Sequence, residues 1–338
     1  MRFLLPIIFA LSAGAQTDPL LSGLEAYRKG DLPAAERNLR IAAKSPDPRA
    51  SAFLALTLAA TGRCDEAVPA LKQAYKGTNA EIARLAGLAF VQCRLTSGPV
   101  EEAAAVINEL KAKHPADADV LYQSARLYMR AWNDTIYLLY QKAPSSFRVN
   151  QLSGEVLETQ GQFTEAAAEY RKAIAKNPRA LNLHFRLGRA LLMSAHSPDV
   201  LDAAMREFQA ELALNPSDSV VLYQIAQILQ NQQKPQEAAA KLQQALALNP
   251  EFPEALIALG KVRVDEKKND EAITLLQRAV KLSPGSESAH YSLMMAYRNA
   301  GRMAEARREK AELDRIQKAP EGEFTDFLKK LGEKPPGQ

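Results

Sequence analysis

Apolar residues along most of this chain recur with the three- and four-residue spacing of an α-helix, and one helical segment is repeated several times. Each copy ends in a proline, and these prolines stand 38, 34 and 34 residues apart, at Pro178, Pro216, Pro250 and Pro284. A large apolar residue lies eight positions before each proline, and alanine lies twelve positions before it. This spacing puts the small and the large positions on one helical face, and the proline ends the helix.

A second helical pattern precedes each copy and has a small residue at its centre. These central residues are Gly154, Gly188, Ala226 and Gly260. Glycine inside a helix costs about 1 kcal/mol relative to alanine, so its recurrence at one position indicates that two helices cross closely there. The repeating unit is therefore a helix–turn–helix of about 34 residues, and the repetition predicts a helical solenoid, because one unit cannot bury its apolar face alone.

The repeat that begins near Phe147 resembles the tetratricopeptide repeat (TPR) family. The matching positions are Gly154, Leu157, Gly161, Ala166, Tyr170, Ala173 and Pro178. The resemblance extends over nearly all of the chain after residue 15. It implies an all-α, TPR-type right-handed helical solenoid over residues 16–318, with about eight to nine helix–turn–helix repeats.

The fourth repeat, about residues 116–146, departs from this pattern. Only 29 residues separate Pro115 from Pro144, and the stretch "RAWNDTIYLLYQKAP" has neither a glycine turn nor an alanine at the small position. We expect either a shortened second helix, capped by Asp134, or one kinked long helix. This segment is also where two stacks of repeats could meet.

In the TPR family the first helix of each repeat lines the concave side of the solenoid. The resemblance implies that residues on either side of the central small position point into this groove, giving an aromatic row beside a mostly basic and polar row. Tyr and Arg are frequent anchors of interfaces. We therefore predict a binding surface formed by Tyr122, Arg126, Phe185, Arg189, Tyr223, Gln227, Lys261 and Tyr291. The alternative is that the aromatic rings only fill gaps between neighbouring first helices.

Some TPR proteins hold a peptide's terminal carboxylate with a fixed set of Lys and Asn residues. The first of those positions carries Tyr122, Gln151 or Phe185 here. The sequence therefore does not support that clamp.

Charge and motifs argue against catalysis and against nucleic acid as a partner. The net charge of +4 is mild for 338 residues, and acidic and basic residues are interspersed without a basic stripe. No two of the four histidines stand within four residues of each other, and phosphate-binding, nucleotide-binding and hydrolase motifs are absent. We predict packing roles for His184 and His290, a loop position for His196, and no metal, cofactor or enzymatic activity.

The first sixteen residues, "MRFLLPIIFALSAGAQ", predict a secretory signal that is removed after Ala15. Arg2 precedes an apolar run that is too short to cross a bilayer, and a small-x-small cleavage site follows. Gln16, rather than cysteine, follows the cleavage site, which argues against lipid anchoring. We expect an exported protein, periplasmic or secreted, with no transmembrane segment after signal removal; the alternative is a buried first helix or strand.

Two cysteines, Cys64 and Cys93, fit an oxidising compartment if they form a disulfide. Both lie near turns of neighbouring repeats, where helices pack about 10 Å apart. A disulfide needs Cα atoms about 4.4 to 6.8 Å apart, so a bridge requires local bending. Two buried free thiols are the alternative.

The C-terminal tail, residues 319–338, contains a short amphipathic pattern in "EFTDFLKKLGEKPPGQ". Its apolar residues Phe324, Phe327, Leu328 and Leu331 share one helical face. We expect a short helix that caps the last repeat, docks in a partner, or plugs the protein's own groove.

These observations favour a non-enzymatic exported scaffold that binds a protein or an extended peptide in a concave TPR groove. One alternative is an accessory subunit of a cell-envelope machine for secretion, assembly or polysaccharide export. Another is an enzyme built on a helical superhelix. That enzyme would need an additional catalytic domain of roughly 150 residues, and no such stretch remains.

Overall fold

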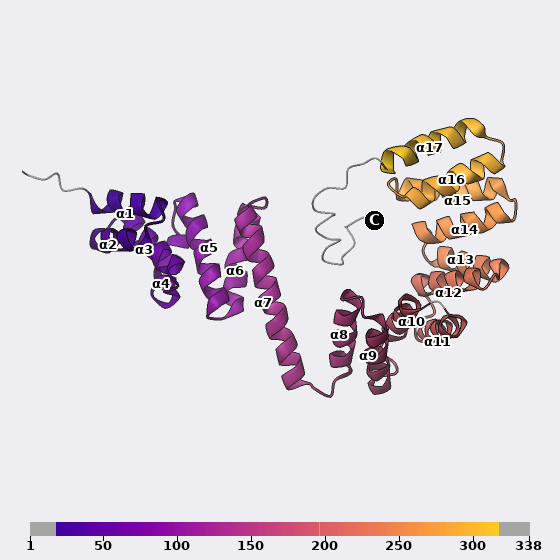
Figure 1. Ribbon diagram of the computed structural model, residues 1–338, viewed down its shortest axis with the longest axis horizontal. Coiled ribbons are helices and arrows are strands. Elements are labelled where there is room, and N and C mark those ends of the chain that lie inside the picture. Colours follow the sequence, from indigo (N-terminus) through magenta and orange to yellow (C-terminus); the bar gives the residue numbers. More distant parts are fainter. Residues whose placement is uncertain (1–17, 196, 318–338) are drawn as a thin grey trace, which may run out of the picture. The chain divides into compact units, whose positions relative to one another are not determined.

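Every regular element in the described part of the chain, residues 18–195 and 197–317 of the computed structural model, is an α-helix (Figure 1). The all-α class expected from the repeat pattern is confirmed. The helices are α1 (Pro19–Arg28), α2 (Leu32–Ala42), α3 (Pro48–Ala60), α4 (Cys64–Tyr75), α5 (Ala80–Thr96), α6 (Val100–Lys113), α7 (Ala118–Lys142), α8 (Phe147–Thr159), α9 (Phe163–Lys176), α10 (Leu183–Ser194), α11 (Pro198–Leu214), α12 (Ser219–Asn231), α13 (Pro235–Leu248), α14 (Pro253–Asp265), α15 (Asn269–Leu282), α16 (Glu287–Asn299) and α17 (Met303–Gln317).

Sixteen of these helices form antiparallel pairs of a first and a second helix, and α7 is single. The pairs are α1–α2, α3–α4, α5–α6, α8–α9, α10–α11, α12–α13, α14–α15 and α16–α17. Of the two forms expected for the fourth repeat, the shortened second helix is wrong. No glycine or proline stands between Ala118 and Lys142 to end the helix, which runs for 25 residues. Asp134 is not a cap but lies 3.1 Å from Nε of Arg130 within the same helix.

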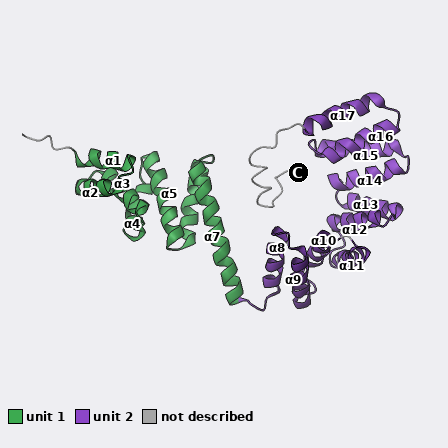
Figure 2. Cartoon of the chain, in the orientation of Figure 1, with its two compact units in different colours: residues 1–142 green, residues 143–338 purple. Residues whose placement is uncertain are grey.

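Contacts between Cα atoms divide the chain into two compact units after Lys142 (Figure 2). Unit 1 comprises residues 1–142 and contains α1 to α7, and unit 2 comprises residues 143–338 and contains α8 to α17. The division falls inside the segment that departs from the repeat pattern.

The repeated positions of the sequence form the core of unit 2. The large residues Tyr170, Phe208, Leu242 and Leu276 are fully buried, as are the alanines four positions before each of them. A Cβ atom at Gly154 would lie 2.6 Å from Cε1 of Tyr170, and one at Gly188 would lie 2.7 Å from Cε1 of Phe208. The large residue of the second helix therefore lies directly against the first helix and leaves no room for a side chain at the central glycine. This confirms the close crossing that the recurring glycine predicts.

The turns inside the pairs need a left-handed backbone. Gly161 and Gly301 have φ angles of 73° and 74° two residues before their second helices begin. Gln233 and Lys267 occupy the same place before α13 and α15, with φ angles of 58° and 60°. A side chain in this conformation costs about 1–2 kcal/mol, so these two turns carry local strain.

First helices of consecutive pairs contact one another more extensively than second helices do. Such contacts join α1 to α3, α3 to α5 and α5 to α7 in unit 1, and α14 to α16 in unit 2. Among the described residues, no two consecutive second helices come together to the same extent. Because elements on the inner side of a curved stack lie closer together, the first helices lie on the concave side at these places.

A disulfide joins Cys64 to Cys93, with their Cα atoms 5.3 Å apart. Cys64 is the first residue of α4, and Cys93 lies near the end of α5, the helix that packs against α4. The two residues therefore face each other between packed helices rather than at equivalent turns. This placement brings the Cα atoms closer than the spacing of neighbouring helix axes.

Two sequence predictions fall outside the described residues: the signal at residues 1–15 and the amphipathic helix within residues 319–338. Both stay predictions. Within residues 18–195 and 197–317, no helix combines the length and apolar character needed to cross a membrane.

Candidate binding surface

The eight residues of the predicted surface are distributed over both units. Tyr122 and Arg126 lie on α7 in unit 1, and the guanidinium of Arg126 is 5.8 Å from the centre of the Tyr122 ring. The other six lie on the first helices α10, α12, α14 and α16 of unit 2. The structure thus brings six predicted residues onto one stack of helices, and the other two belong to a separate unit.

These six residues differ in exposure. Arg189, Lys261 and Tyr291 are exposed, and the Tyr291 side chain is 52% accessible. Phe185, Tyr223 and Gln227 are half-buried. The ring centre of Phe185 lies 5.9 Å from that of Phe208, and the ring centre of Tyr223 lies 5.2 Å from that of Phe252. Burial also raises the pKa of Tyr223. Phe185 thus packs on the second helix of its own repeat and Tyr223 packs on the residue before α14, whereas Tyr291 is exposed.

A cavity of about 510 Å³ lies between α8 and α10, at the start of unit 2. It brings together three residues of the predicted groove positions, Gln151, Phe185 and Arg189. The rest of its lining comes from the start of α8, from the loop before α10 and from α10 itself: Phe147, Arg148, Asn177, Ala180, Leu181, Asn182 and Arg186. Three guanidinium groups, two aromatic rings and three amides thus surround one space, and none of its lining residues is acidic.

Two carboxylates of α8 hold two of the guanidinium groups. Arg186 pairs with Glu155 at 3.2 Å and with Glu158 at 3.3 Å, and Arg189 lies 3.4 Å from the other oxygen of Glu158. Glu158 also accepts a hydrogen bond of 2.7 Å from the Tyr170 hydroxyl. Burial and the neighbouring Glu158 carboxylate raise the pKa of Tyr170 well above its ordinary value. Tyr170 therefore remains a hydrogen-bond donor, and the two arginines are oriented by groups that lie outside the cavity.

The third guanidinium, on Arg148, has no ion-pair partner among the described residues. It donates a hydrogen bond of 2.6 Å to Oε1 of Gln151 and lies 4.5 Å from the centre of the Phe147 ring. The side chain is exposed. Arg148 is therefore the cation of this cavity most available to an incoming anion.

Glu211 positions one wall of the cavity. It is fully buried, and its carboxylate accepts hydrogen bonds from the backbone N–H groups of Asn182 at 2.7 Å and Phe185 at 3.2 Å. A carboxylate at a helix N-terminus satisfies free N–H groups and opposes the positive end of the helix dipole. Glu211 thereby fixes the start of α10, which carries Phe185, Arg186 and Arg189.

The repeat alignment did not identify Arg148, Arg186, Glu158 or Glu211 as parts of a site. Only Glu211 gave a signal, because it stands where Ala173, Ala245 and Ala279 stand in the other repeats. Arg186 directly follows the groove position Phe185, and Arg148 lies three residues before the groove position Gln151, so neither stands where the family pattern indicates.

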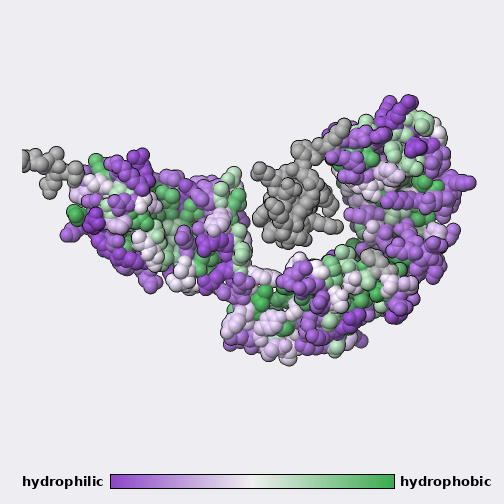
Figure 3. Space-filling model, in the orientation of Figure 1, coloured by the Kyte–Doolittle hydropathy of each residue, from purple (hydrophilic) through white to green (hydrophobic). Residues whose placement is uncertain are grey.

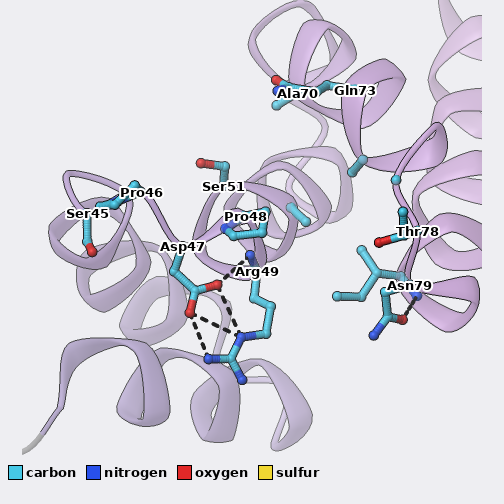
Figure 4. A pocket seen from close by; sticks show the side chains of 14 residues that line it. Ser45, Pro46, Asp47, Pro48, Arg49, Ser51, Ala70, Gln73, Thr78 and Asn79 are labelled. Carbon is cyan, nitrogen blue, oxygen red and sulfur yellow. Dashed lines mark hydrogen bonds and ion pairs between the residues drawn. The ribbon is translucent and has the colours of Figure 1, made fainter.

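A larger cavity, of about 990 Å³, lies in unit 1 beside the loops before α3 and α5 (Figure 4). Asp47 and Arg49 point toward one another at its edge, with Oδ2 of Asp47 2.7 Å from Nη2 of Arg49. Asp47 and Asn79 also cap α3 and α5 by accepting hydrogen bonds from Arg49 N–H and Ile82 N–H. The hydrogen bonds to Arg49 lower the pKa of Asp47. Because these polar groups already pair with each other or cap helices, this cavity is a weaker candidate for a binding site than the one in unit 2.

The described histidines of unit 2 connect helices of their own repeats. Nδ1 of His184 lies 2.6 Å from Glu207, and Nδ1 of His290 lies 2.7 Å from Glu309. Nε2 of His290 is 3.0 Å from the carbonyl oxygen of Pro284. These contacts fit the packing roles that their sequence positions indicate. His196 lies outside the described residues, and within the described ranges no three His, Cys, Asp or Glu side chains form a group that could hold a metal ion.

The tetratricopeptide repeat family matches residues 20–82, 152–219 and 223–287, more than half of the chain, and a second model of the repeat matches residues 263–321. No curated protein matches the chain.

Several solved structures are similar in fold. MamA is 22% identical, with a TM-score of 0.44, over 51% of this chain and 91% of MamA. MamA (41-end) from Desulfovibrio magneticus RS-1 is 16% identical, with a TM-score of 0.47, over 53% of this chain and 98% of that one. YrrB, a TPR protein described as having an unusual peptide-binding site, is 19% identical, with a TM-score of 0.44, over 58% of this chain and 97% of YrrB. These scores describe a likeness of fold and carry no conclusion about function.

Proposed function

The chain belongs to the tetratricopeptide repeat family, and we propose that it is a non-enzymatic exported scaffold that binds an extended, acidic segment of a partner protein in the groove of unit 2. The observation that carries this proposal is the cavity between α8 and α10, where Arg148, Arg186 and Arg189 surround a space whose lining contains no acidic residue.

The arrangement suits a peptide that carries a carboxylate. Guanidinium groups bind carboxylates through paired, charge-assisted hydrogen bonds. Arg186 and Arg189 are already oriented by Glu155 and Glu158, so less side-chain freedom is lost when a ligand binds. Arg148 supplies the cation without an opposing carboxylate, and the amides of Asn177 and Asn182 offer hydrogen bonds to a peptide backbone.

The rings of Phe147 and Phe185 supply the apolar part of the cavity. Further along the stack, the exposed side chains of Lys261 and Tyr291 would extend the contact to later residues of the same segment. A partner in an extended conformation would meet these groups one after another, which is how a solenoid offers a long surface of weak and strong contacts.

Export and the absence of catalysis belong to the same proposal. The N-terminal sequence through Ala15 has the parts of a secretory signal, and the Cys64–Cys93 disulfide suits an oxidising compartment. His184 and His290 are engaged in hydrogen bonds between the helices of their own repeats. Because these two histidines are used in packing, we propose that the chain acts through surface contacts with a partner rather than through a reactive side chain.

Affinity capture from a cell-envelope extract, with mass spectrometry of the bound proteins, tests the proposal. The double variant Arg148→Ser, Arg189→Ser should lose the proteins that the unaltered chain retains. The matched control is Arg171→Ser, Arg206→Ser, which removes two exposed arginines from the second helices α9 and α11 and should retain them. Retention should also weaken as salt rises, because exposed charges are screened. Equal retention by both variants would refute the groove as the binding site.

A further inference from the structure

The chain beyond α17 contains a segment whose chemistry matches the cavity between α8 and α10. This acidic segment, residues 321–328, reads "EGEFTDFL" and holds three carboxylates, two phenylalanines and one leucine, with no cationic side chain. The lining of the cavity holds three guanidinium groups, two aromatic rings and no acidic residue. At the other end of the chain, residues 1–17 contain no acidic residue. Charge complementarity therefore selects the C-terminal segment over the N-terminal one.

The C-terminal tail leaves unit 2 at the edge where the cavity lies. Nε2 of Gln317, the last residue of α17, donates a hydrogen bond of 3.1 Å to Oε2 of Glu287, the first residue of α16. The cavity is lined by residues from the start of α8 and from the start of α10. Because successive helices of the stack alternate in direction, the starts of its first helices lie along one edge. The end of α17 and the cavity are therefore on the same edge of unit 2.

The tail is long enough to reach the cavity. Phe327 lies ten residues beyond Gln317, and a chain spans at most about 3.3–3.6 Å per residue, so Phe327 can be placed up to about 33–36 Å away. Helix α10 is the third first helix before α16. Because neighbouring helices pack about 10 Å apart, the distance from α16 to α10 along the first helices is about 30 Å.

The surface along this path offers contacts for the earlier part of the acidic segment. Lys261 of α14 is exposed, and its Nζ lies 3.2 Å from the Ser288 hydroxyl of α16. This ammonium group is therefore near the place where the tail leaves the stack. Further along, hydrophobic side chains lie among hydrophilic ones on the visible surface of unit 2 where α8 and α10 are (Figure 3). A segment with both carboxylates and aromatic rings suits such a surface.

We propose that the acidic segment occupies the cavity between α8 and α10 of the same copy, so that a partner must displace it in order to bind. The proposal rests on the proposed function, because it names a competitor for the same site. The carboxylate of Asp326 would lie among the guanidinium groups, where charge-assisted hydrogen bonds form. The rings of Phe324 and Phe327 would pack beside the two aromatic rings of the lining.

Attachment to the same chain favours this occupant over the tail of a second copy. A ligand joined to its site by a short linker is present at an effective concentration in the millimolar range, whereas a second copy at micromolar concentration is about 1000-fold more dilute. The acidic segment therefore needs a dissociation constant of only about a millimolar to fill half of the sites. A partner that binds much more tightly still displaces it.

Photo-cross-linking of the purified full chain, with no partner present, tests the proposal. A photoreactive residue replaces Gln151 in the cavity, and peptide mapping identifies what it reaches. The product should join position 151 to residues 320–331, and Arg148→Ser, Arg189→Ser should lower its yield at least ~10-fold, because the charge-assisted hydrogen bonds are lost. In a mixture of isotopically light and heavy copies, both parts of the product should carry the same label. A photoreactive residue at Arg171, exposed on α9, should not reach the tail.

Substitutions in the tail separate the acidic segment from the residues that follow it. Phe324→Ser, Phe327→Ser should lower the yield from position 151 at least ~10-fold, because two apolar contacts are lost. The matched control, Lys329→Ser, Lys330→Ser, changes two residues of the same tail outside the acidic segment and should leave the yield unchanged. The unfolding temperature should be the same for both tail variants and the unaltered chain.

Three results would overturn the proposal: no product with the tail, a product only between differently labelled copies, or equal yields from the two tail variants. A lower unfolding temperature in Phe324→Ser, Phe327→Ser would also overturn it and would assign the tail to covering the last repeat.

The cross-linking experiment contains no partner, so affinity capture judges the proposed function separately. In that capture Phe324→Ser, Phe327→Ser should retain more of the partner than the unaltered chain. Weaker retention would mean that the tail itself docks in the partner, and it would overturn the proposal. If nothing is captured while the product with the tail forms, the proposed function is wrong and the contact with the tail stands.

Discussion

The hydroxyl of Tyr170 donates a hydrogen bond of 2.7 Å to Glu158, and that same carboxylate pairs with Arg186 and Arg189 of the next repeat. Tyr170 is also the large residue that packs on Gly154. One side chain therefore belongs both to the core of its repeat and to the support of the candidate binding surface. A substitution of Tyr170 should therefore affect both the packing of its repeat and the candidate binding surface.

Replacing Tyr170 by phenylalanine should destabilise the chain by about 1.5–3 kcal/mol, because a hydrogen bond to a carboxylate with a mostly buried side chain is lost while the ring remains. Urea unfolding followed by circular dichroism measures the change. Tyr128→Phe is the control, since its hydroxyl is 3.5 Å from Asn108 at an exposed site, and it should change stability by less than about 0.5 kcal/mol. Equal effects of the two variants would show that the Tyr170–Glu158 bond contributes nothing specific.

Replacing Gly154 by alanine should cost about 1–3 kcal/mol, because the added methyl group would have to displace the Tyr170 ring. The hydroxyl of that ring is also hydrogen-bonded to Glu158, which limits how far the ring can move. Gly285→Ala is a suitable comparison, since no atom lies within 4 Å of the position where its Cβ would be placed. Thermal unfolding of both variants checks the close crossing of α8 and α9. A neutral Gly154→Ala would mean that the crossing is looser than described.

Tyr223 and Tyr291 should respond differently to replacement by alanine. Tyr223 packs on Phe252 and is half-buried, so Tyr223→Ala should lower the unfolding temperature. Tyr291 is exposed, so Tyr291→Ala should leave stability nearly unchanged and weaken partner binding by about 1–3 kcal/mol if it anchors the interface. Paired melting and binding measurements with the captured partner separate the effects. Loss of stability in Tyr291→Ala without loss of affinity would assign that ring to packing as well.

Acid should weaken the junction before α7 through Asp117. Its carboxylate accepts N–H hydrogen bonds from Val120 at 3.0 Å and Asp119 at 2.9 Å, and Arg84 lies 2.9 Å away. These hydrogen bonds, led by the one from Val120, and the Arg84 charge lower the pKa of Asp117 in the folded chain.

Because the unfolded chain binds this proton more readily, the stabilisation is present above the ordinary aspartate pKa and is lost as pH falls through the lowered value. Unfolding free energies measured between neutral and acidic pH should therefore depend less on pH in Asp117→Asn than in the unaltered chain. The same acid dependence in both would exclude Asp117 as a contributor.

The repeat positions were sufficient to predict most of the fold. Prolines at a fixed spacing mark the ends of second helices. A central glycine in the first helix and a large residue in the second indicate that the two helices of one repeat pack closely, and both signals lie within a single repeat of the sequence. Residues 116–146 were ambiguous because the sequence lacks both turn signals there. The lack of a glycine turn was the decisive feature, since nothing else stops α7 before Lys142.

The candidate site was only partly predictable, because its contacts depend on how one repeat is set against the next. Nothing in the local sequence shows that Arg186 reaches back to Glu155 and Glu158. Glu211 stands at a repeat position that is alanine in the other repeats, so the sequence alone suggests a poor match to the pattern, yet its side chain caps α10. It does so because the loop 177–182 has six residues where 215–218 has four, and Asn182, at the cap position, makes no side-chain cap of its own.

Site-specific photo-cross-linking to the native partner would locate the binding surface on unit 2 directly. A photoreactive residue replaces either Gln151, which lines the cavity of unit 2, or Arg171, which is exposed on the second helix α9 of the same repeat. The partner should be cross-linked from position 151, this product should be lost in Arg148→Ser, Arg189→Ser, and position 171 should give no product. Cross-linking from position 171 and none from position 151 would contradict the proposed binding surface.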